Sequence, residues 1–559
     1  MAYNSPIHYE RVKTMKHTRL PAVLLAALLL AGCGADRTAA KPTVPASDMT
    51  QIVLSDSGIT VDGTGAGTDD TAAVYTANDI VYYEAGKDFT YGEGSEADAH
   101  TPEEAAAHTV VHITQPGTYA ISGRLSLGQI AVDLGSDAKK DPEAVVTLVL
   151  NGVDITCEVA PAVIFYNVYE CGDDDPETAA KDVDTFAAGA NVVIADGTVN
   201  TVSGAYVARI YDPESVVLNA DKTAVEDASK LHKYDGAFYS RRSMNIYGGE
   251  EDSGVLQINA QNEGLDSEMH LTIHGGDIRI ASGNDGINTN EDGVSVTTVN
   301  GGSVTIRVTG ETGEGDGIDS NGWLVINGGT VMASACADSG DAGIDSDMGI
   351  HINGGTVIAS GHMLDRIEDG GQTYGVFSFA GTQTGGQTIA LTDGEGKTIL
   401  ETAPENAYSV LIFSSPDLLP GTYTLSRDGQ TLIGSSGGMM GGHGMGPDGM
   451  EPPGDGQQLP EDFVPGQGQR PPAGEMPPED FTRPQEGGFP EDFTLPEGET
   501  LPAMPEGFGP GRPGANGGMG GGEPAADFVI RDGGNMFGGI TDGAETEGMM
   551  SGTTELTGN

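Results

Sequence analysis

The sequence predicts an all-β fold, a single-stranded right-handed parallel β-helix, and three observations support this prediction. Glycine contributes 86 of the 559 residues, which suits turn-dense β repeats and argues against a helical bundle. Short β-branched runs alternate with Gly, Asn and Asp turns, and their period is two residues rather than helical. A Gly-Gly pair also recurs at a nearly constant interval in the middle of the chain.

Residues 1–33 have the pattern of a bacterial lipoprotein signal. Basic residues precede the apolar run Pro21–Ala31, which is about 11 residues long and too short to span a bilayer. Leu30-Ala31-Gly32-Cys33 resembles a lipobox, which implies cleavage before Cys33 and a diacylglyceryl group on its sulfur. The alternative is an ordinary signal with a chance cysteine. We expect the protein on the extracellular face of the bacterial cell membrane, attached to the membrane only through the lipid at Cys33.

Composition divides the remaining chain into segments. Ser, Thr, Ala and Asp dominate the first of them, and β-branched alternation follows. A Gly, Pro and Met-rich stretch then lacks the apolar residues that would offset its ordering entropy, so we expect it to be disordered. The predicted segments are a flexible tether (34–78), the β-helix (79–436), a disordered Gly/Pro-rich tail (437–523), a returning strand (524–541) and a disordered end (542–559).

The internal repeat selects the architecture. A coil of about 26 residues with two or three short strands fits a parallel β-helix, whereas a propeller blade needs about 40 residues. A propeller and then a sandwich remain the alternatives. The Gly-Gly pairs begin at Gly248, Gly275, Gly301, Gly328 and Gly354, which are 27, 26, 27 and 26 residues apart.

Stacked coils would bring acidic residues into columns. Successive coils pair at roughly 4.8 Å, so equivalent side chains become neighbours. Two carboxylates at that separation repel by about 3–4 kcal/mol at an effective dielectric near 20, and a cation would relieve the repulsion. Oxygen ligands favour Ca²⁺, although Asx-turn residues at exposed corners would give the same pattern. One column holds Asp266, Asn288, Asp319 and Asp345; the position just before holds Asp285, Asp316 and Asp341, with Glu263 in the earlier coil.

Alternation also predicts an outer face that could bind sugar. His270, Trp323 and Gly349 share one outward position in coils that align without gaps. A flat aromatic ring can stack on a sugar ring, and the alternative is that Trp323 packs under a neighbouring loop. Arg241 and Arg242 are a candidate base or uronate clamp, with a solvated pair as the alternative.

Three cysteines follow Cys33 in the chain. Outside the cytosol, Cys157 and Cys171 could close a loop of about 14 residues as a disulfide. The alternative is two buried thiols that behave as small apolar residues. Cys336 is the odd cysteine, and we expect it to be buried.

A family resemblance rests on motifs in a fixed order. Gln115–Gly123 (QPGTYAISG), Val149–Thr156 (VLNGVDIT), Asp235-Gly236 and the Gly-Ile-Asp-Ser coils resemble the secreted bacterial carbohydrate-binding domain family. The resemblance spans about residues 79–436. It implies a calcium-binding parallel β-helix, similar to polysaccharide lyases, that binds cell-wall glycans, cellulose or acidic sugars. By motif position it implies calcium ligands at Asp266, Asp285, Asp316, Asp319, Asp341 and Asp345.

Charge and residue content separate the function classes. The formal net charge of −57 excludes an electrostatic nucleic-acid binder. A lyase acting on uronate polymers needs a base, and no Lys lies between residues 235 and 360. We therefore expect a monomeric, non-catalytic polysaccharide binder with Ca²⁺ as its cofactor. The alternatives are a calcium-dependent polysaccharide lyase and a passive surface adhesin or spacer.

Overall fold

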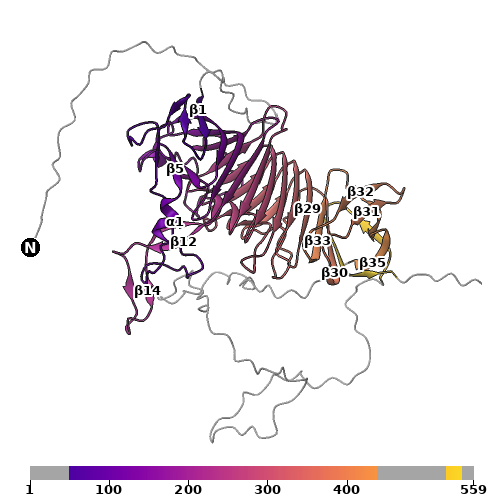
Figure 1. The fold of residues 1–559 in the computed structure, drawn as a ribbon. Coiled ribbons are helices and arrows are strands. Elements are labelled where there is room, and N and C mark those ends of the chain that lie inside the picture. Colours follow the sequence, from indigo (N-terminus) through magenta and orange to yellow (C-terminus); the bar gives the residue numbers. More distant parts are fainter. Residues whose placement is uncertain (1–48, 437–523, 544–559) are drawn as a thin grey trace, which may run out of the picture. The chain divides into compact units, whose positions relative to one another are not determined.

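The structure is a computed structural model that describes residues 49–436 and 524–543. The predicted signal, Cys33 and the predicted Gly/Pro-rich tail lie outside these residues. The described chain is nearly all β, and its sheets are rich in parallel pairs (Figure 1). Its helices are the short α1 (Pro102–Ala106) and a 3₁₀ turn at Ala138–Lys140, and no described helix is long and apolar enough to cross a membrane.

Three ladders of strands run through the middle of the chain. We call the first of them the acidic ladder. Its neighbouring strands pair in parallel, except for the antiparallel β4–β5 pair, and together they form an eight-stranded sheet. The strands are β4 (Val74–Ala77), β5 (Thr109–Ile113), β7 (Gly128–Asp133), β9 (Val163–Asn167), β16 (Gly236–Ser240), β19 (Glu263–Ser267), β22 (Ile287–Thr289) and β25 (Ile318–Ser320).

The other two ladders share two long strands, β6 (Gly117–Leu125) and β8 (Val146–Cys157). Both then continue through parallel pairs. The second ladder adds β10 (Ala190–Ile194), β17 (Met244–Tyr247), β20 (Leu271–Ile273), β23 (Val296–Val299), β26 (Trp323–Ile326) and β28 (Gly349–Ile352). The third adds β11 (Val199–Gly204), β18 (Val255–Ala260), β21 (Asp277–Ser282), β24 (Ser303–Val308), β27 (Thr330–Ser334) and β29 (Thr356–Gly361).

Each winding contributes one strand to each ladder in chain order, as β19, β20 and β21 do, followed by β22, β23 and β24. Because the register is the same from winding to winding, similar side chains lie next to each other. Leu324 pairs with Ile350 and Ile326 with Ile352, and all four side chains are buried. Burying each such side chain contributes about 1.5–3 kcal/mol, which explains why the interior positions repeat.

The Gly-Gly pairs lie where one winding passes directly over the next. Gly329 has φ +76°, and a Cβ there would lie 2.7 Å from the carbonyl oxygen of Gly302. An asparagine precedes each of the last three pairs, and these form a column in which Asn353 donates to Asn327 (2.8 Å) and Asn327 to Asn300 (2.9 Å). The close approach of neighbouring backbones therefore explains the glycines of the repeat, and the column of side-chain amides explains the asparagines.

Ordered structure starts earlier than the sequence predicted. Residues 49–78, expected to be tether, contain β1 (Thr50–Leu54), β2 (Thr60–Val61), β3 (Thr64–Gly65) and β4. Strand β1 extends the parallel sheet by pairing with β6, and Ile52 and Leu54 are buried. Two apolar side chains at alternate positions were enough to recruit a segment whose composition is otherwise polar.

The parallel windings end before residue 436, so the predicted extent of the β-helix is corrected. From residue 374 most pairings are antiparallel, and the β34–β35 hairpin turns through Asp428 and Gly429, both with positive φ. An Asp-Gly pair of this kind favours a tight hairpin. These strands are β30 (Tyr374–Gln383), β31 (Ile389–Asp393), β32 (Thr398–Thr402), β33 (Tyr408–Ser414), β34 (Gly421–Arg427) and β35 (Gln430–Ser436).

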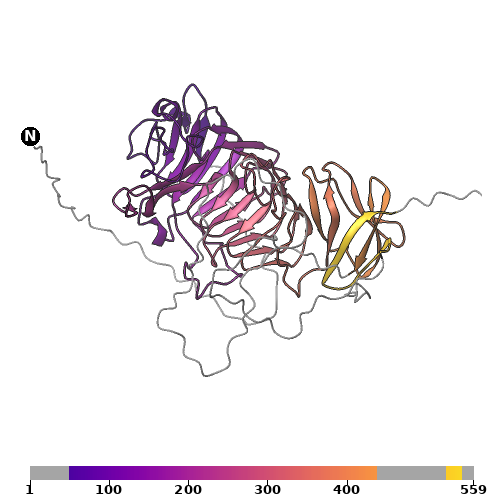
Figure 2. The same cartoon turned by 90° about the horizontal axis from the view of Figure 1, so that it is seen from below.

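Two strands from the far end of the chain complete this C-terminal part. β36 (Asp527–Ile530) pairs with β34, and β37 (Gly534–Asp542) pairs with β30 and β35 (Figure 2, yellow). Phe528 and Phe537 pack against Phe377, with ring centroids 5.7 and 5.2 Å apart. This aromatic cluster is separate from the core of the windings.

Two small hairpins project from the windings before β16. β12 (Val207–Tyr211) pairs with β15 (Lys230–Tyr234), and β13 (Val217–Leu218) pairs with β14 (Val225–Asp227). Strand β15 brings Lys230 and Lys233 to the acidic ladder, where Lys230 forms an ion pair with Glu268 and Lys233 one with Asp235.

Candidate functional site

The acidic ladder carries one polar side chain per winding at a constant position. Asp266 in β19 pairs with Asn288 in β22, which pairs with Asp319 in β25. The bridge between Ile318 and Ile344 places Asp345 next in this column. In-register parallel pairing therefore makes neighbours of residues that are far apart in the sequence.

Three carboxylates meet at the start of β16 and β19. Asp235, Glu263 and Asp266 are buried, and each places an oxygen within 4.8 Å of the others. We call these residues the acidic triad. Among residues 49–436 and 524–543, no other group of three or more His, Cys, Asp or Glu side chains approaches this closely.

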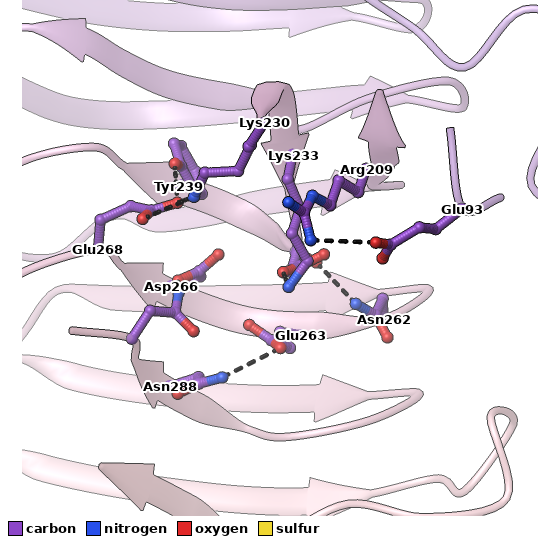
Figure 3. Close-up of polar contacts among 12 residues, drawn as sticks. Glu93, Arg209, Lys230, Lys233, Tyr239, Asn262, Glu263, Asp266, Glu268 and Asn288 are labelled. Atoms are coloured by element: carbon purple, nitrogen blue, oxygen red, sulfur yellow. Dashed lines mark hydrogen bonds and ion pairs between the residues drawn. The ribbon is translucent and has the colours of Figure 1, made fainter. Parts of the chain in front are cut away.

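Hydrogen bonds engage one oxygen each of Glu263 and Asp266. Asn288 Nδ2 donates to Glu263 Oε1 at 3.1 Å (Figure 3), and Asn290 Nδ2 donates to Asp266 Oδ1 at 2.6 Å. Lys233 Nζ lies 2.5 Å from Asp235 Oδ2. Three buried oxygens at this site have no hydrogen-bond partner among the residues that the structure describes: Glu263 Oε2, Asp266 Oδ2 and Asn288 Oδ1. Buried acceptors without a donor are costly, so these atoms are positions where a proton or a cation would be bound.

The electrostatics of the triad lead to the same conclusion. Burial, followed by the charges of Asp266 and Asp235, raises the pKa of Glu263 well above its usual value. Burial and Asp235 raise the pKa of Asp266 in the same way, and burial raises the pKa of Asp235 although Lys233 opposes it. Three carboxyl groups in this position must either retain protons or share a cation.

The donor set fits a hard divalent cation. Its members are carboxylate and amide oxygens, which Ca²⁺ and Mg²⁺ prefer, and no sulfur or imidazole belongs to the triad. A polar cavity of about 320 Å³ reaches Asp235 and gives solvent access. Its lining is Lys230, Lys233, Asp235, Glu268, Asn290, Glu291, Asp292 and Asn321.

The other predicted metal ligands lie further along the ladder and mainly serve the backbone. Asp285 Oδ1 accepts the Asp316 N–H (2.7 Å), Asp316 Oδ1 accepts the Ala342 N–H (2.5 Å), and Asp341 Oδ2 accepts the Gly315 N–H (2.6 Å). These bonds tie one winding to the next across 26 to 31 residues, so they differ from the local Asx turns at exposed corners that were the alternative interpretation.

The carboxyl groups of these residues nevertheless raise one another's pKa. Burial is the main cause that raises the pKa of Asp285, Asp319 and Asp345 to about 7 each, and the pKa of Asp316 to about 9. Neighbouring carboxylates add to each of these shifts, for example Asp285 acting on Asp319. The column therefore has a high affinity for protons or cations along its length.

Comparisons with known proteins match the windings that contain this site. The family model described as carbohydrate-binding domain-containing protein matches residues 107–172 and 177–375. A carbohydrate-binding domain-containing protein of Acetivibrio thermocellus is 31% identical over 172 residues, which are 30% of this chain and 44% of that protein. Both matches are similarities of this part of the chain to the carbohydrate-binding domain family. The chain thus spans less than half the length of this relative.

A solved structure is also similar to part of this chain. It is the polysaccharide lyase-like protein from C. thermocellum, determined as a gadolinium derivative. The TM-score is 0.32 and the sequence identity 20%, over 55% of this chain and 90% of that chain. At this TM-score the likeness does not define the fold of the present chain.

The structure corrects one of the predicted sugar contacts. His270 is 1% exposed, and its Nδ1 accepts the Val296 N–H at 3.1 Å. The turn at Gly172 covers its other ring nitrogen, because a Cβ on Gly172 would lie 2.5 Å from His270 Nε2. Alternation placed His270 on the outer side of the strand, but the chain near residue 172 folds over that side.

The remaining predicted sugar contacts are accessible to different degrees. Trp323 is half-buried and pairs with Gly349, so no side chain lies beside it on that strand. Arg241 is exposed, whereas Arg242 is half-buried and its Nε has no partner. Cys157 and Cys171 are both free thiols, and burial raises the pKa of each to about 12.

Sequence reasoning missed Asp235 and Lys233 as members of the site and did not select Glu263 as a ligand. A signal for the two acids was present: an acidic residue directly precedes Gly in Asp235-Gly236 and Glu263-Gly264, as it does at Asp285 and Asp316. The same residue pattern marks the start of four strands of the acidic ladder: β16, β19, β22 and β25.

Proposed function

We propose that this protein binds polysaccharide without cleaving it, through windings held together by Ca²⁺ at the acidic triad. The observation that carries the proposal is the set of unpartnered buried oxygens on Glu263, Asp266 and Asn288. Asp235, Glu263 and Asp266 would hold the ion, and their location in the matched family segment supports a role in carbohydrate binding. When bound, the cation supplies charge neutralisation between neighbouring windings.

The protonation state of Lys233, which forms an ion pair with Asp235 of the acidic triad, favours a binding protein over a lyase. Burial lowers the pKa of Lys233, but the charge of Asp235 outweighs that effect and the net pKa is raised. Lys233 is therefore protonated at neutral pH and cannot accept a proton from a uronate carbon. Lys230 is likewise engaged, in an ion pair with Glu268 at 2.9 Å.

We further propose the finer features that the sequence predicts. The windings form a right-handed parallel β-helix, and the chain is a monomeric lipoprotein attached at Cys33 to the extracellular face of the membrane. Loss of metabolic [³H]palmitate labelling in a C33A variant would support the anchor. Retention of the label in that variant would contradict it.

The central test measures Ca²⁺ binding and polysaccharide binding on the same protein sample. The purified protein is treated with EDTA, titrated with Ca²⁺ by calorimetry, and then applied to insoluble cellulose, peptidoglycan and pectin in pull-down assays. We expect a saturable Ca²⁺ site and retention on at least one polysaccharide that falls after EDTA. Absence of retention on every polysaccharide would refute binding and favour the spacer. Release of unsaturated, ultraviolet-absorbing products from polygalacturonate would instead identify a lyase.

A further inference from the structure

The segment between β9 and β10 passes over the outer face of the second ladder, and we call residues 171–188 the strap. The strap contains no helix or strand. The Gly189 N–H donates to the Tyr169 carbonyl oxygen at 2.9 Å, so the two ends of the strap lie side by side. Residues 173–176 lie outside the segments that the family model matches. The strap is therefore a closed surface loop that includes an insertion relative to the family model.

One side chain of the strap fixes it to the ladder. The Thr185 hydroxyl lies 2.8 Å from Asn245 Oδ1 and 2.7 Å from Thr272 Oγ1, and Asn245 Nδ2 donates to the Thr185 carbonyl oxygen at 2.8 Å. Asn245 in β17 and Thr272 in β20 pair in register, and alternation directs both side chains outward. Their exposed fractions are nevertheless 0% and 3%. The strap thus buries polar positions that the ladder by itself would present to solvent.

The strap covers this face without satisfying its hydrogen-bonding groups. Among the described residues, His270 Nε2, the Tyr247 hydroxyl and His274 Nε2 are buried without a hydrogen-bond partner. His270 Nδ1 accepts the Val296 N–H, so the neutral ring carries its proton at Nε2 and buries a donor without an acceptor. Burial lowers the pKa of His274, and the nearby charge of Asp184 in the strap opposes this shift. Unpartnered buried polar atoms are costly, so the closed strap carries a penalty that opening relieves.

Little apolar contact holds the strap in place. Thr185 and Ala188 are its only buried residues, and its one aromatic side chain, Phe186, is 51% exposed. The ion pair that Asp174 forms with Lys139 (2.6 Å) lies at the surface, where such pairs contribute little. The strap also carries six acidic residues against one lysine, so its charges repel one another. Segments with few buried apolar contacts are those that open at a low free-energy cost.

The covered positions continue into the accessible part of the same face. Val296, which binds His270, pairs with Trp323, the half-buried ring that the sequence predicts as a sugar contact. We propose that the strap is an autoinhibitory cover, which closes over one end of the polysaccharide-binding face and competes with the polysaccharide for it. Opening the strap would present Asn245 and Thr272 to the hydroxyl groups of a glycan that contacts Trp323. This inference rests on the proposed polysaccharide binding and adds its regulation.

The test uses T185V, which removes the hydroxyl that holds the strap and keeps the size of the side chain. The matched control is T178V, because the Thr178 hydroxyl donates to Asp173 and to the Asp175 carbonyl oxygen, both within the strap. Opening is measured without any glycan, as the rate at which diethyl pyrocarbonate modifies His270, followed by peptide mass spectrometry. We expect this rate to rise about threefold or more in T185V and to stay unchanged in T178V.

Polysaccharide binding is measured on the same proteins, by depletion from solution onto cellulose, peptidoglycan and pectin in saturating Ca²⁺. Apparent affinity depends on the fraction of molecules whose face is open. T185V should therefore bind at least one of these polysaccharides about threefold or more tightly than the wild type, and T178V should match the wild type. A second variant replaces residues 171–188 with Gly-Ser-Gly-Ser and should show the same gain. Its thermal unfolding midpoint reports whether the windings remain folded.

The outcomes separate this inference from the broader proposal. Faster modification of His270 in T185V with unchanged or weaker polysaccharide binding overturns autoinhibition and leaves polysaccharide binding in place. Equal modification rates in T185V and the wild type also overturn it, because the strap then does not open. If no polysaccharide is retained by the wild type, by T185V or by the shortened variant, this inference and the proposed function both fail.

Discussion

Replacing Asp266 with asparagine should raise the stability of the metal-free protein while weakening its affinity for Ca²⁺. The substitution is nearly isosteric, and the hydrogen bond that Asn290 donates to Asp266 Oδ1 is retained by the amide oxygen. It removes one negative charge from three carboxylates that have oxygens within 4.8 Å of one another. The same change therefore acts in opposite directions on the empty and the occupied site.

The size of the effect follows from the geometry. Two charges 4.8 Å apart repel by about 3–4 kcal/mol at an effective dielectric near 20. Protonation relieves part of this repulsion, because the pKa of Asp266 is raised by burial and by Asp235. We therefore expect metal-free D266N to be about 2–3 kcal/mol more stable at pH 8.5 and nearly unchanged at pH 5. Ca²⁺ affinity should fall at least tenfold.

The assay is thermal and denaturant unfolding of the wild type and D266N, each in EDTA and in excess Ca²⁺, at both pH values. The wild type should gain stability on adding Ca²⁺, and D266N should gain much less. The control is D277N, which removes a carboxylate from the outer face of the same winding, where it is paired with Arg279. This variant should respond to Ca²⁺ as the wild type does.

One result would refute the reasoning. If D266N in EDTA is less stable than the wild type at pH 8.5, and its response to Ca²⁺ is unchanged, then the carboxylates do not repel and do not hold a cation. The triad would then be a structural hydrogen-bonding group, and the Ca²⁺ proposal would be withdrawn.

Three further predictions concern pH, the backbone and the half-buried Trp323. Because the native pKa of Asp285, among other carboxyl groups, is about 7 against roughly 3.9 unfolded, the native state binds more protons between these values. Stability in EDTA should thus fall from pH 4 to 7, by up to about 1.4 kcal/mol per pH unit per group, and a flat profile in thermal melts would contradict this. Gly329→Ala should lower the free energy of unfolding by more than the roughly 1–2 kcal/mol that a positive φ costs a residue with a side chain, because the new Cβ would lie 2.7 Å from a carbonyl oxygen. The control is Gly313→Ala, where φ is +92° but nothing lies near the new Cβ. The difference between the two variants in denaturant unfolding measures the clash. Trp323→Ala should keep its unfolding midpoint and lose roughly threefold to tenfold in polysaccharide affinity, and unchanged retention in pull-downs would remove Trp323 from the site.

The stacking of Asp266, Asn288 and Asp319 could be predicted from the sequence because a parallel ladder converts a constant interval into spatial contact. The Gly-Gly interval sets which residues pair, and alternation sets which side chains point inward, as Leu324 and Ile350 do. Both are local properties of each winding. The column of polar residues was therefore predictable without knowledge of the rest of the chain.

The composition of the triad was not predictable in the same way. Asp235 is the single residue between β15 and β16, so its approach to Glu263 and Asp266 depends on the position of β15 and on the ion pair with Lys233. Strand β15, which carries Lys233, comes from a projecting hairpin outside the regular windings. No repeat period describes an irregular insertion.

By itself the sequence determined the β class, the winding interval, the polar column and the pattern of an N-terminal signal, because each of these depends only on the type and spacing of residues within a short stretch of chain. Tertiary structure alone decided that β1 joins β6, that the turn at Gly172 buries His270, and that β37 pairs with β30. These contacts join segments separated by stretches without periodicity. Their free energy comes from mutual burial, which depends on the partner surface and not on the local pattern of either segment.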